Sequence, residues 1–539
     1  MVIDEFDTQI CKENVLNLLD CFEGNPVYEA KSISDYAGSL LDMLKSNGYY
    51  MAAPCNSKGT CGKCKIKIIK GNIPVSQSDK SFFTQKELDQ GYRLACMAYP
   101  RFDCTFEAIL DGEESIDVLT KSNIAEGRTK THANESKAKE VGTKKGIVVD
   151  IGTTTIAMQL ISLATGEVLN TYASVNKQRA YGTDVISRIE ASIAGQKDIL
   201  RKIIQRELQV GIEYLAADDI ANISKVIIGA NTTMVHLLMG YDCNTLGVYP
   251  FTPVNITTIY TSLSDLLEAN IGEAEVIIYS GISTYVGGDI VAGLLALDFE
   301  KKEKVSVLID LGTNGEMAIG NKDKLLVTST AAGPAFEGGN IICGVASVAG
   351  AICSVDINED KVTTKTIGDK QAIGICGTGV IEAVAGLLEE KVIDETGLLE
   401  DKYFDDGFLL AKGKGDYKIA IYQKDIREIQ LAKAAVRAGV ETLISRYGVD
   451  YDEIEHIYIA GAFGYQMDIP KALSIGLLPE ELEQKIKTVG NTCLSGTRKY
   501  LLEENSEQAI WQIIDSSSEI QLSNDKKFNE LYVKYMYFD

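Results

Sequence analysis

Short apolar runs that stop at glycine recur through most of the chain. A run of about four to eight apolar residues is typical of a strand buried on both faces, and a glycine after it permits a tight turn. The runs are GIVVDIG (146–152), KVIIGAN (225–231), VSVLIDLG (305–312) and HIYIAGAFG (456–464). Helical spacing of apolar residues lies between them, most clearly over Gln430–Ser445. The pattern predicts an α/β architecture from Gly146 onward, in which ligands bind where the strands end.

The N-terminal residues follow a different pattern. Val27–Glu29 is weakly strand-like, Ser39–Ser46 has helical spacing, and KCKIKIIKG (63–71) alternates Lys and Ile as a half-buried strand does. The segment that follows is polar, charged and almost free of aromatic residues, which is typical of a linker. We therefore expect a first domain over residues 1–108, a linker over 109–145, and two further parts over 146–303 and 304–539.

Composition and charge exclude several classes of protein. The chain has 539 residues, of which 45% are hydrophobic and 24% charged, as in globular proteins. Its 53 basic and 76 acidic residues give a formal net charge of −23, which disfavours nucleic acids and anionic membranes as partners. No apolar stretch approaches the roughly 20 residues that cross a bilayer. The N-terminus, MVIDEFDTQ, lacks the cationic and apolar parts of a signal peptide, so we expect a cytoplasmic protein.

Four of the twelve cysteines lie close together with the spacing C-x5-C-x2-C-x31-C. They are Cys55, Cys61, Cys64 and Cys96. In a reducing compartment, clustered thiols bind metal more often than they form disulfides. Small residues at Gly59 and Gly62 let the loop wrap closely and present backbone N–H groups to sulfur. The alternatives are a zinc site, whose ligands usually come as two pairs, and free cysteines.

The cysteine loop, the strand after it and the RLACM segment around Cys96 resemble a ferredoxin domain with the adrenodoxin-like x5 gap. This resemblance implies a β-grasp, ferredoxin-like domain in which the four cysteines hold a [2Fe–2S] cluster. Cys104, Cys11 and Cys21 fall outside the spacing, and we interpret them as ordinary residues.

Two glycine loops follow apolar strands and are alike. The first contains Asp150, Gly152, Thr153, Thr154 and Thr155, and the second contains Asp310, Gly312, Thr313, Asn314 and Glu316. Such a turn offers backbone N–H groups to phosphate oxygens, and the aspartate can hold Mg²⁺ directly or through water. One copy alone is compatible with an ordinary strand and turn, whereas two copies suggest a duplicated α/β unit.

The two loops resemble the phosphate loops of the superfamily that contains acetate and sugar kinases, heat-shock chaperones and actin. Tyr285–Gly293 resembles the first connecting helix of that superfamily, and Gly490–Gly496 the second. Gly461, Ala462 and Phe463 resemble its adenosine loop. The resemblance implies a duplicated actin-like, ribonuclease H-like ATPase domain that binds ATP with Mg²⁺.

Four carboxylates are candidates for the chemistry of this domain. The resemblance implies that Asp150 and Asp310 face each other near Mg²⁺, and Asp289 or Glu316 could position the attacking water. For Asp289, a role as the N-cap of a helix is equally compatible with the sequence. Of the three histidines, we expect His236 and His456 to be packed core residues.

A ferredoxin-like domain joined to this ATPase fold resembles the reductive activators of corrinoid proteins, including the activating enzymes of corrinoid O-demethylase systems. Further stretches that resemble this family are GANTTM (229–234), TAAGPAFEGGNI (330–341), GICGTGVIEAV (374–384) and IAGAFGYQMDIPKALSIGLLP (459–479). The resemblance implies that an upstream low-potential donor reduces the cluster. The cluster then passes one electron to a Co(II) corrinoid on a partner protein, with the support of ATP. The chain has no DxHxxG segment, so we expect the corrinoid on that partner.

One departure from the family and three rival functions remain open. Family members often carry a middle domain, whereas here Gly146 follows the linker directly, which puts contacts through such a domain in doubt. The rivals are a small-molecule kinase with a regulatory cluster, a chaperone-like ATPase with a structural cluster, and an activator of radical or dehydratase enzymes. A homodimer is compatible with the sequence, which does not reveal the oligomeric state.

Overall fold

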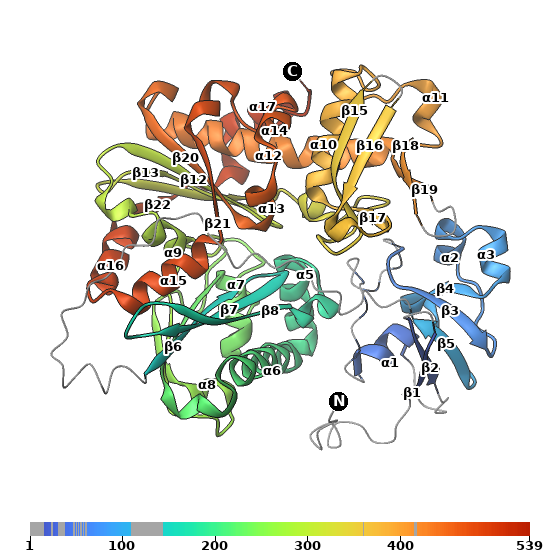
Figure 1. Cartoon of the computed structure of the whole chain (residues 1–539), viewed down its shortest axis with the longest axis horizontal. Helices are drawn as coiled ribbons and strands as arrows, with labels where there is room; N and C mark the ends of the chain where they lie inside the picture. Colours follow the sequence, from blue (N-terminus) through green and yellow to red (C-terminus); the bar gives the residue numbers. More distant parts are fainter. Residues whose placement is uncertain are drawn as a thin grey trace. The chain divides into compact units, whose positions relative to one another are not determined.

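The computed structural model of the chain consists of two compact units, each described here by itself (Figure 1). The first unit comprises residues 1–114 and 177–196, and the second comprises 115–176 and 197–539. The structure describes residues 16–22, 25–30, 38–46, 49, 51, 53, 57, 59, 62–108, 144–358, 361–413 and 418–538. Nearly all of the predicted linker lies outside these ranges, as do Cys11, Cys55 and Cys61.

The first unit is built on a five-stranded sheet in the order β1-β2-β5-β3-β4, in which all paired strands are antiparallel. Helix α1 (Leu40–Ser46) buries Leu40, Leu41 and Leu44 in a core that also contains Tyr28 and Phe106. The strands are β1 (Leu16–Phe22), β2 (Asn25–Ala30), β3 (Lys65–Lys70), β4 (Tyr92–Leu94) and β5 (Cys104–Ala108). This is the predicted ferredoxin-like arrangement, and the three elements expected near residues 27, 39 and 63 are confirmed.

Short helices complete the first unit. Helices α2 (Gln77–Phe82) and α3 (Gln85–Asp89) lie between β3 and β4, and each begins with a capping box, Ser76 with Asp79 and Thr84 with Glu87. In such a box both residues satisfy backbone N–H groups that have no partner within the helix. The segments of the range 177–196 are η3 (Lys177–Tyr181), α5 (Val185–Ala191) and η4 (Ser192–Gln196).

The second unit contains two six-stranded sheets with the same plan. Their strand orders are β10-β11-β9-β6-β7-β8 and β21-β20-β12-β13-β14-β22. In each sheet three consecutive strands form an antiparallel meander, and the first of them pairs in parallel with a strand from much later in the chain. Figure 1 shows this for the second sheet, where β20 lies beside β12. The duplicated, actin-like architecture predicted from the two glycine loops is confirmed.

The four strands predicted from apolar runs form the centres of these sheets. They are β6 (Lys145–Ile151), β9 (Ile223–Ala230), β12 (Val305–Leu311) and β20 (Ile454–Ala460). Their neighbours are β7 (Thr155–Ser162), β8 (Val168–Val175), β10 (Ile259–Ser262), β11 (Glu275–Ile278), β13 (Gly315–Gly320), β14 (Leu325–Thr330), β21 (Ile486–Gly490) and β22 (Ser517–Glu519). The sequence analysis did not single out these neighbouring strands.

Two helices join the sheets. The core around α9 (Gly288–Ala296) and α15 (Thr492–Leu502) contains Val148 of β6 as well as Leu308 of β12. The helices approach each other very closely, because a Cβ atom on Gly496 would lie 1.9 Å from the carbonyl oxygen of Ala292. They are the two connecting helices that the sequence predicts.

An inserted region lies between β14 and the long helix α12 (Gln423–Tyr447). Helix α12 begins earlier than the predicted Gln430, because Asp425 accepts a hydrogen bond from the backbone N–H of Tyr422 and starts the helix in a polar stretch. The insert contains β15 (Ala351–Asn358), β16 (Lys361–Thr366), β17 (Gly374–Ile375), α10 (Gly377–Glu389), α11 (Asp401–Phe404), β18 (Phe408–Lys412) and β19 (Lys418–Ile421).

The remaining helices cover the two sheets. They are α6 (Lys197–Ala216), α7 (Thr232–Met239), α8 (Leu263–Leu267), α13 (Gly461–Gln466), α14 (Ile469–Ser474), α16 (Ser506–Ser516) and α17 (Lys526–Lys534). Within the described ranges, no helix combines the length and the apolar character that a bilayer crossing requires.

Candidate functional site

The first glycine loop is a tight turn between β6 and β7 that two asparagines support. The N–H of Gly152 donates to the carbonyl of Thr155 over 2.9 Å and closes the turn. Asn176 donates to the carbonyl of Gly152 (2.9 Å), and Asn231 donates to the hydroxyl of Thr153 (3.1 Å). Side-chain amides therefore support the backbone and a hydroxyl of the loop.

Asp150 lies on β6 just before this loop and is tied to the second connecting helix. The amide of Asn491 donates to its carboxylate over 2.8 Å, while the carbonyl of the same side chain caps α15 by accepting the N–H of Leu494. The buried thiol of Cys493 also hydrogen-bonds with Asp150. Sequence reasoning had identified this stretch only as the start of a helix.

The second glycine loop repeats the turn between β12 and β13. The N–H of Gly312 donates to the carbonyl of Asn314 over 3.0 Å. Asp310 and Glu316 are directly opposite each other on the paired strands, so their side chains lie on the same face. At the corresponding place in the first sheet, Asp150 is opposite Ala157. The acidic partner is therefore a feature of the second copy alone.

The four predicted carboxylates influence one another's ionisation. Burial, together with the nearby Asp150 carboxylate, raises the pKa of Asp289 to about 7. Burial and the carboxylates of Asp289 and Asp150 raise the pKa of Asp310 to about 7. Burial and the carboxylates of Asp289 and Asp310 raise the pKa of Glu316 well above its usual range. Burial also raises the pKa of Asp150, although hydrogen bonds from Asn491 and Cys493 oppose the shift.

Such a group of carboxylates suits a hard divalent cation. No basic side chain among the described residues is a cause of these four pKa shifts. Within the same residues, no three His, Cys, Asp or Glu side chains are placed to hold a metal ion together. Mg²⁺ commonly takes one or two carboxylates and completes its shell with water and substrate phosphates, so the donor set fits that ion.

The proposed adenosine loop begins directly after β20. Gly461 has a φ of 86°, and a Cβ atom there would lie 2.5 Å from the carbonyl oxygen of Leu311 and 2.9 Å from the carboxylate of Asp310. Only glycine allows this close approach to the second glycine loop. The loop is in fact the first turn of α13, which also contains Ala462 and Phe463. The ring of Phe463 stacks on Phe336, with ring centroids 4.8 Å apart.

One carboxylate that the sequence did not single out lies between the two glycine loops. The hydroxyl of Thr154 donates to both carboxylate oxygens of Glu337, at 3.1 and 3.2 Å, and the hydroxyl of Thr313 donates to one of them at 3.0 Å. Glu337 ends the short helix η7 (Pro334–Glu337). It falls within a stretch that resembles the corrinoid activators, but no spacing rule connects it to the glycine loops.

The other sequence expectations for this unit have mixed outcomes. Asp289 is not the N-cap of α9, because that position is Gly287; the Asp289 carboxylate instead accepts the N–H of Ile290 in the first turn. His236 is fully buried and hydrogen-bonded through both ring nitrogens to backbone groups, as expected of a core residue. The same expectation is wrong for His456, which is only half-buried and lies beside Lys487, whose ammonium is 2.9 Å from its Nε2.

In the first unit, two of the four predicted cluster ligands can be described. The Sγ atoms of Cys64 and Cys96 lie 3.3 Å apart and are buried. The N–H of Ala95 donates to the carbonyl of Cys64 and so ties the two cysteine segments together. The N–H of Leu94 donates to the buried carboxylate of Asp79 and supports the second segment. Thiolates this close can share one iron, so the described pair fits a [2Fe–2S] cluster.

The two glycines that the sequence singled out in the cysteine loop have a left-handed backbone conformation. Gly59 and Gly62 both have a φ of 70°. A Cβ atom on Gly62 would lie 2.4 Å from the ring of Phe82, so α2 covers the loop at this point. Cys104 is a buried residue of β5, and burial together with Asp103 raises the pKa of its thiol to about 11, in keeping with an ordinary core cysteine.

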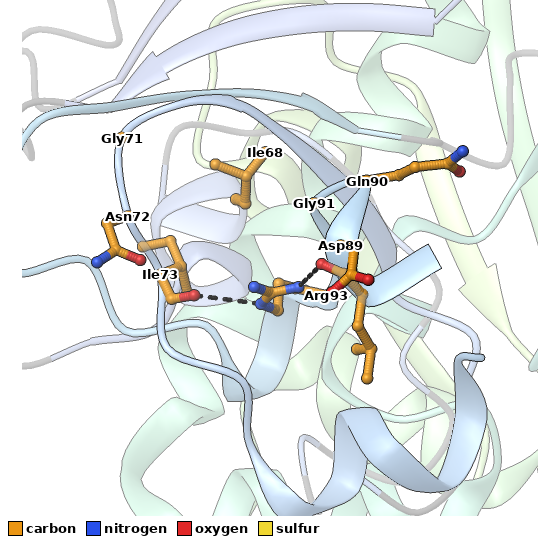
Figure 2. Close-up of a pocket in the computed structure, with 9 residues that line it drawn as sticks. Ile68, Gly71, Asn72, Ile73, Asp89, Gln90, Gly91 and Arg93 are labelled. Atoms are coloured by element: carbon orange, nitrogen blue, oxygen red, sulfur yellow. Dashed lines mark hydrogen bonds between the residues drawn. The ribbon is translucent and has the colours of Figure 1, made fainter. Parts of the chain in front are cut away.

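A surface hollow of about 250 Å³ on the same unit is a separate feature (Figure 2). Arg93 lies at its centre and donates to the backbone carbonyls of Ile73, Leu88 and Tyr92. Neither Cys64 nor Cys96 lines the hollow. Because its guanidinium is hydrogen-bonded to backbone carbonyls, Arg93 supports the local fold.

Three family models match the chain. They describe a 2Fe-2S iron-sulfur cluster binding domain over residues 31–101, the middle region of RACo over 145–302, and the C-terminal ASKHA domain of RACo over 304–539. The expectation that a middle domain is missing is therefore wrong. The middle region is the part of the chain that follows the linker, residues 145–302, and it contains the first six-stranded sheet with its helices.

Similar proteins extend over most of the chain. The corrinoid activation enzyme RamQ of Eubacterium limosum is 34% identical over 413 residues, which cover 72% of this chain and 69% of the relative. The [Co(II) methylated amine-specific corrinoid protein] reductase of Methanosarcina barkeri is 27% identical over 422 residues, covering 72% and 76%. A solved structure of a reductive activator for corrinoid, iron-sulfur protein superposes with a TM-score of 0.65 at 28% identity, covering 94% of this chain and 96% of that one.

Proposed function

The chain belongs to the family of reductive activators of corrinoid proteins, and we propose that it transfers one electron from a [2Fe–2S] cluster to the Co(II) corrinoid of a partner protein in an ATP-dependent reaction. The product is the Co(I) corrinoid, which is ready to accept a methyl group. When bound, the cluster supplies an electron at a potential typically near −400 mV for plant-type ferredoxins. Because Co(I) is difficult to reach from such a potential, an energy-linked step must favour the reduced cobalt.

The observation that carries the nucleotide part of this proposal is the convergence of the two glycine loops on one anionic group. Thr154 of the first loop and Thr313 of the second both donate to the Glu337 carboxylate. Two loops that can hydrogen-bond one carboxylate together can also bind one phosphate chain between them. This geometry supports a site for ATP between the two sheets of the second unit.

The site residues have separate roles in the proposal. Backbone N–H groups and hydroxyls of Gly152–Thr155 and of Gly312–Asn314 bind the phosphates, and Gly461–Phe463 adjoins the adenosine. Asp150 and Asp310 hold Mg²⁺, whose charge offsets the mutual repulsion of the carboxylates.

The remaining two carboxylates serve hydrolysis. Asp289 or Glu316 positions the attacking water, since phosphoryl transfer depends mainly on orientation and charge neutralisation. The pKa of Asp289, raised to about 7, is typical of a group that exchanges a proton near neutral pH. Burial and the neighbouring carboxylates also raise the pKa of Glu316 well above its usual range.

The electron-transfer part requires partners and a suitable compartment. Cys55, Cys61, Cys64 and Cys96 hold the cluster, and an upstream low-potential donor reduces it. The thiolates that hold iron persist in a reducing compartment such as the cytoplasm, which is where we place the protein. The strongly negative chain is a poor match for nucleic acid or an anionic membrane, and a homodimer is compatible with the proposal.

A visible-spectrum assay for Co(I) tests the proposal. The full chain, isolated without oxygen, is mixed with a Co(II) corrinoid protein and a low-potential chemical donor, with and without ATP and Mg²⁺. We expect Co(I) to form with ATP, Cys61→Ala to abolish the electron transfer, and Asp310→Ala to remove the stimulation by ATP. Asp323→Ala, at an exposed aspartate of the β13–β14 turn, should leave the rate unchanged.

Three results would contradict parts of this assignment. Full reductase activity in Cys61→Ala would exclude the cluster as the source of the electron. Undiminished ATP stimulation in Asp310→Ala would mean that the nucleotide binds elsewhere. A phosphorylated small-molecule product in place of Co(I) would favour a kinase.

A further inference from the structure

Glu337 uses the hydroxyl hydrogens that nucleotide phosphates would need. A threonine hydroxyl has one hydrogen to donate. The hydroxyls of Thr154 and Thr313 both donate their hydrogen to Glu337, with hydroxyl-to-carboxylate oxygen distances of 3.0 to 3.2 Å. A phosphate oxygen that accepts from either hydroxyl must therefore displace the carboxylate from it.

The backbone around Glu337 is tightly packed and holds the carboxylate at this place. Glu337 lies at the end of η7, between Gly333 and Gly338, whose φ angles are 77° and 76°. A Cβ atom on Gly338 would lie 2.3 Å from the carbonyl oxygen of Val345, which fixes the backbone after the helix. The preceding residue, Phe336, is buried and stacks on Phe463 beside the proposed adenosine position. Helix η7 therefore connects the carboxylate between the glycine loops with the adenosine loop.

We propose that Glu337 is a phosphate surrogate, a residue that bridges the two glycine loops while the site is empty and sets the affinity for nucleotides whose phosphates reach both loops. The proposal rests on the assignment of the second unit as an ATP site. A carboxylate and a phosphate oxygen are both anionic acceptors of similar size, so they compete for the same donors and repel each other at short range. Glu337 thus weakens the binding of ATP and leaves the binding of AMP, which lacks the outer phosphates, unaffected.

Removal of this charge should increase the affinity for ATP. In Glu337→Gln the side chain keeps its size and one acceptor oxygen but loses its charge. We expect the Kd for ATP with Mg²⁺ to fall on the order of tenfold, as calorimetry on the full chain would measure. The Kd for AMP should stay within about twofold of that of the unaltered chain, since a purely structural role for Glu337 would alter both nucleotides alike.

Two further variants make the result specific. Glu483→Gln removes the same charge from an exposed residue of η11 (Glu480–Lys485) and should leave both Kd values unchanged. Glu337→Asp keeps the charge but is one methylene shorter, so it cannot reach both hydroxyls as Glu337 does. Its affinity for ATP should lie between those of the unaltered chain and of Glu337→Gln, and it also serves if Glu337→Gln does not fold.

The possible outcomes distinguish this inference from the proposed function. Tighter ATP binding with unchanged AMP binding supports the surrogate role. If ATP binds to the unaltered chain and binds Glu337→Gln equally well or more weakly, the surrogate role is wrong and the nucleotide site stands. If the unaltered chain binds no ATP at all, the nucleotide assignment itself fails.

Discussion

At the scale of single residues, the second unit concentrates unfavourable charge. Asp150, Asp289, Asp310 and Glu316 are half-buried and repel one another, and all four have raised pKa values. Such a cluster costs stability whenever it is ionised and has no counterion. A bound cation would offset the charge of the cluster and so remove this cost.

This cluster predicts how stability depends on pH. The folded chain keeps the proton of Asp289 up to about pH 7, whereas an unfolded aspartate loses it near 3.8. Between these values the folded state binds more protons than the unfolded state, so stability falls as the pH rises. Asp289→Asn removes one of these groups. We expect its melting temperature, measured without nucleotide or Mg²⁺, to rise relative to that of the unaltered chain as the pH increases from about 4 to about 7.

A matched variant controls this measurement. Asp323→Asn changes the same chemical group at an exposed position, and its melting temperature should follow that of the unaltered chain at every pH. If the difference between Asp289→Asn and the unaltered chain did not change with pH, the pKa of Asp289 would not be raised in the folded chain.

Sequence reasoning identified the residues whose chemistry is tied to a pattern. The aspartates and threonines of the glycine loops follow apolar strands, and their spacing makes them visible. Glu337 and Asn176 have no such pattern, because tertiary structure brings them to the loops. Asn231 does follow an apolar strand, but nothing in the sequence shows that its amide donates to Thr153. Only the fold could reveal these contacts.

At the scale of helices and strands, the crossing of α9 and α15 is the tightest contact between the two halves of the second unit. Gly496 faces the carbonyl of Ala292, and Gly293 faces Thr492, where a Cβ atom would lie 2.8 Å from the hydroxyl oxygen. Small residues on both helices allow this approach. In two-lobed ATPases closure on the nucleotide is a hinge motion, and the helices at such a crossing must stay in contact throughout it.

A single methyl group should disturb this crossing. Gly496→Ala places a carbon 1.9 Å from the Ala292 oxygen, so the helices must separate. We expect the free energy of unfolding to fall by about 1–3 kcal/mol, as measured by denaturant titration. Glu504→Ala, at an exposed position just after α15, should change it by less than about 0.5 kcal/mol. Equal stability of the two variants would show that the helices can adjust without cost.

The elements themselves were predictable to different degrees. The four central strands are buried on both faces and have uninterrupted apolar sequences. Strands such as β8 and β16 have mixed, partly exposed sequences, with Thr and Asn at several positions, and are fixed by the neighbours with which they pair. Helix boundaries are harder to predict. The polar first turn of α12 depends on Asp425, the third residue of the helix, which accepts a hydrogen bond from the N–H of the N-cap residue Tyr422.

At the scale of the whole molecule, one chain combines two kinds of chemistry. The first unit has its own core around Tyr28 and Phe106, and the second has separate cores that include the glycine loops' strands. We therefore expect each unit to stay folded when the other loses its cofactor.

Paired variants test whether both activities must reside in the same chain. Cys64→Ser should lose the cluster and keep ATP binding, and Asp310→Asn should keep the cluster and lose the stimulation by ATP. Iron content, ATP affinity and Co(I) formation measure the three properties. If each chain works alone, an equimolar mixture of the two variants will not recover ATP-dependent reduction. Recovery in the mixture would mean that one copy supplies the electron and another the nucleotide response, as a functional dimer would.

The pair of sulfur atoms at 3.3 Å has a consequence for the life of the protein in air. In the proposed cluster site, the thiols of Cys64 and Cys96 are close enough to react with each other once iron has left. An oxidant then joins them into cystine, a form with no free thiolate to offer a metal. Damage by oxygen would therefore persist after the oxygen is gone, and repair would have to begin with a reductant that reopens the bond before iron and sulfide are supplied.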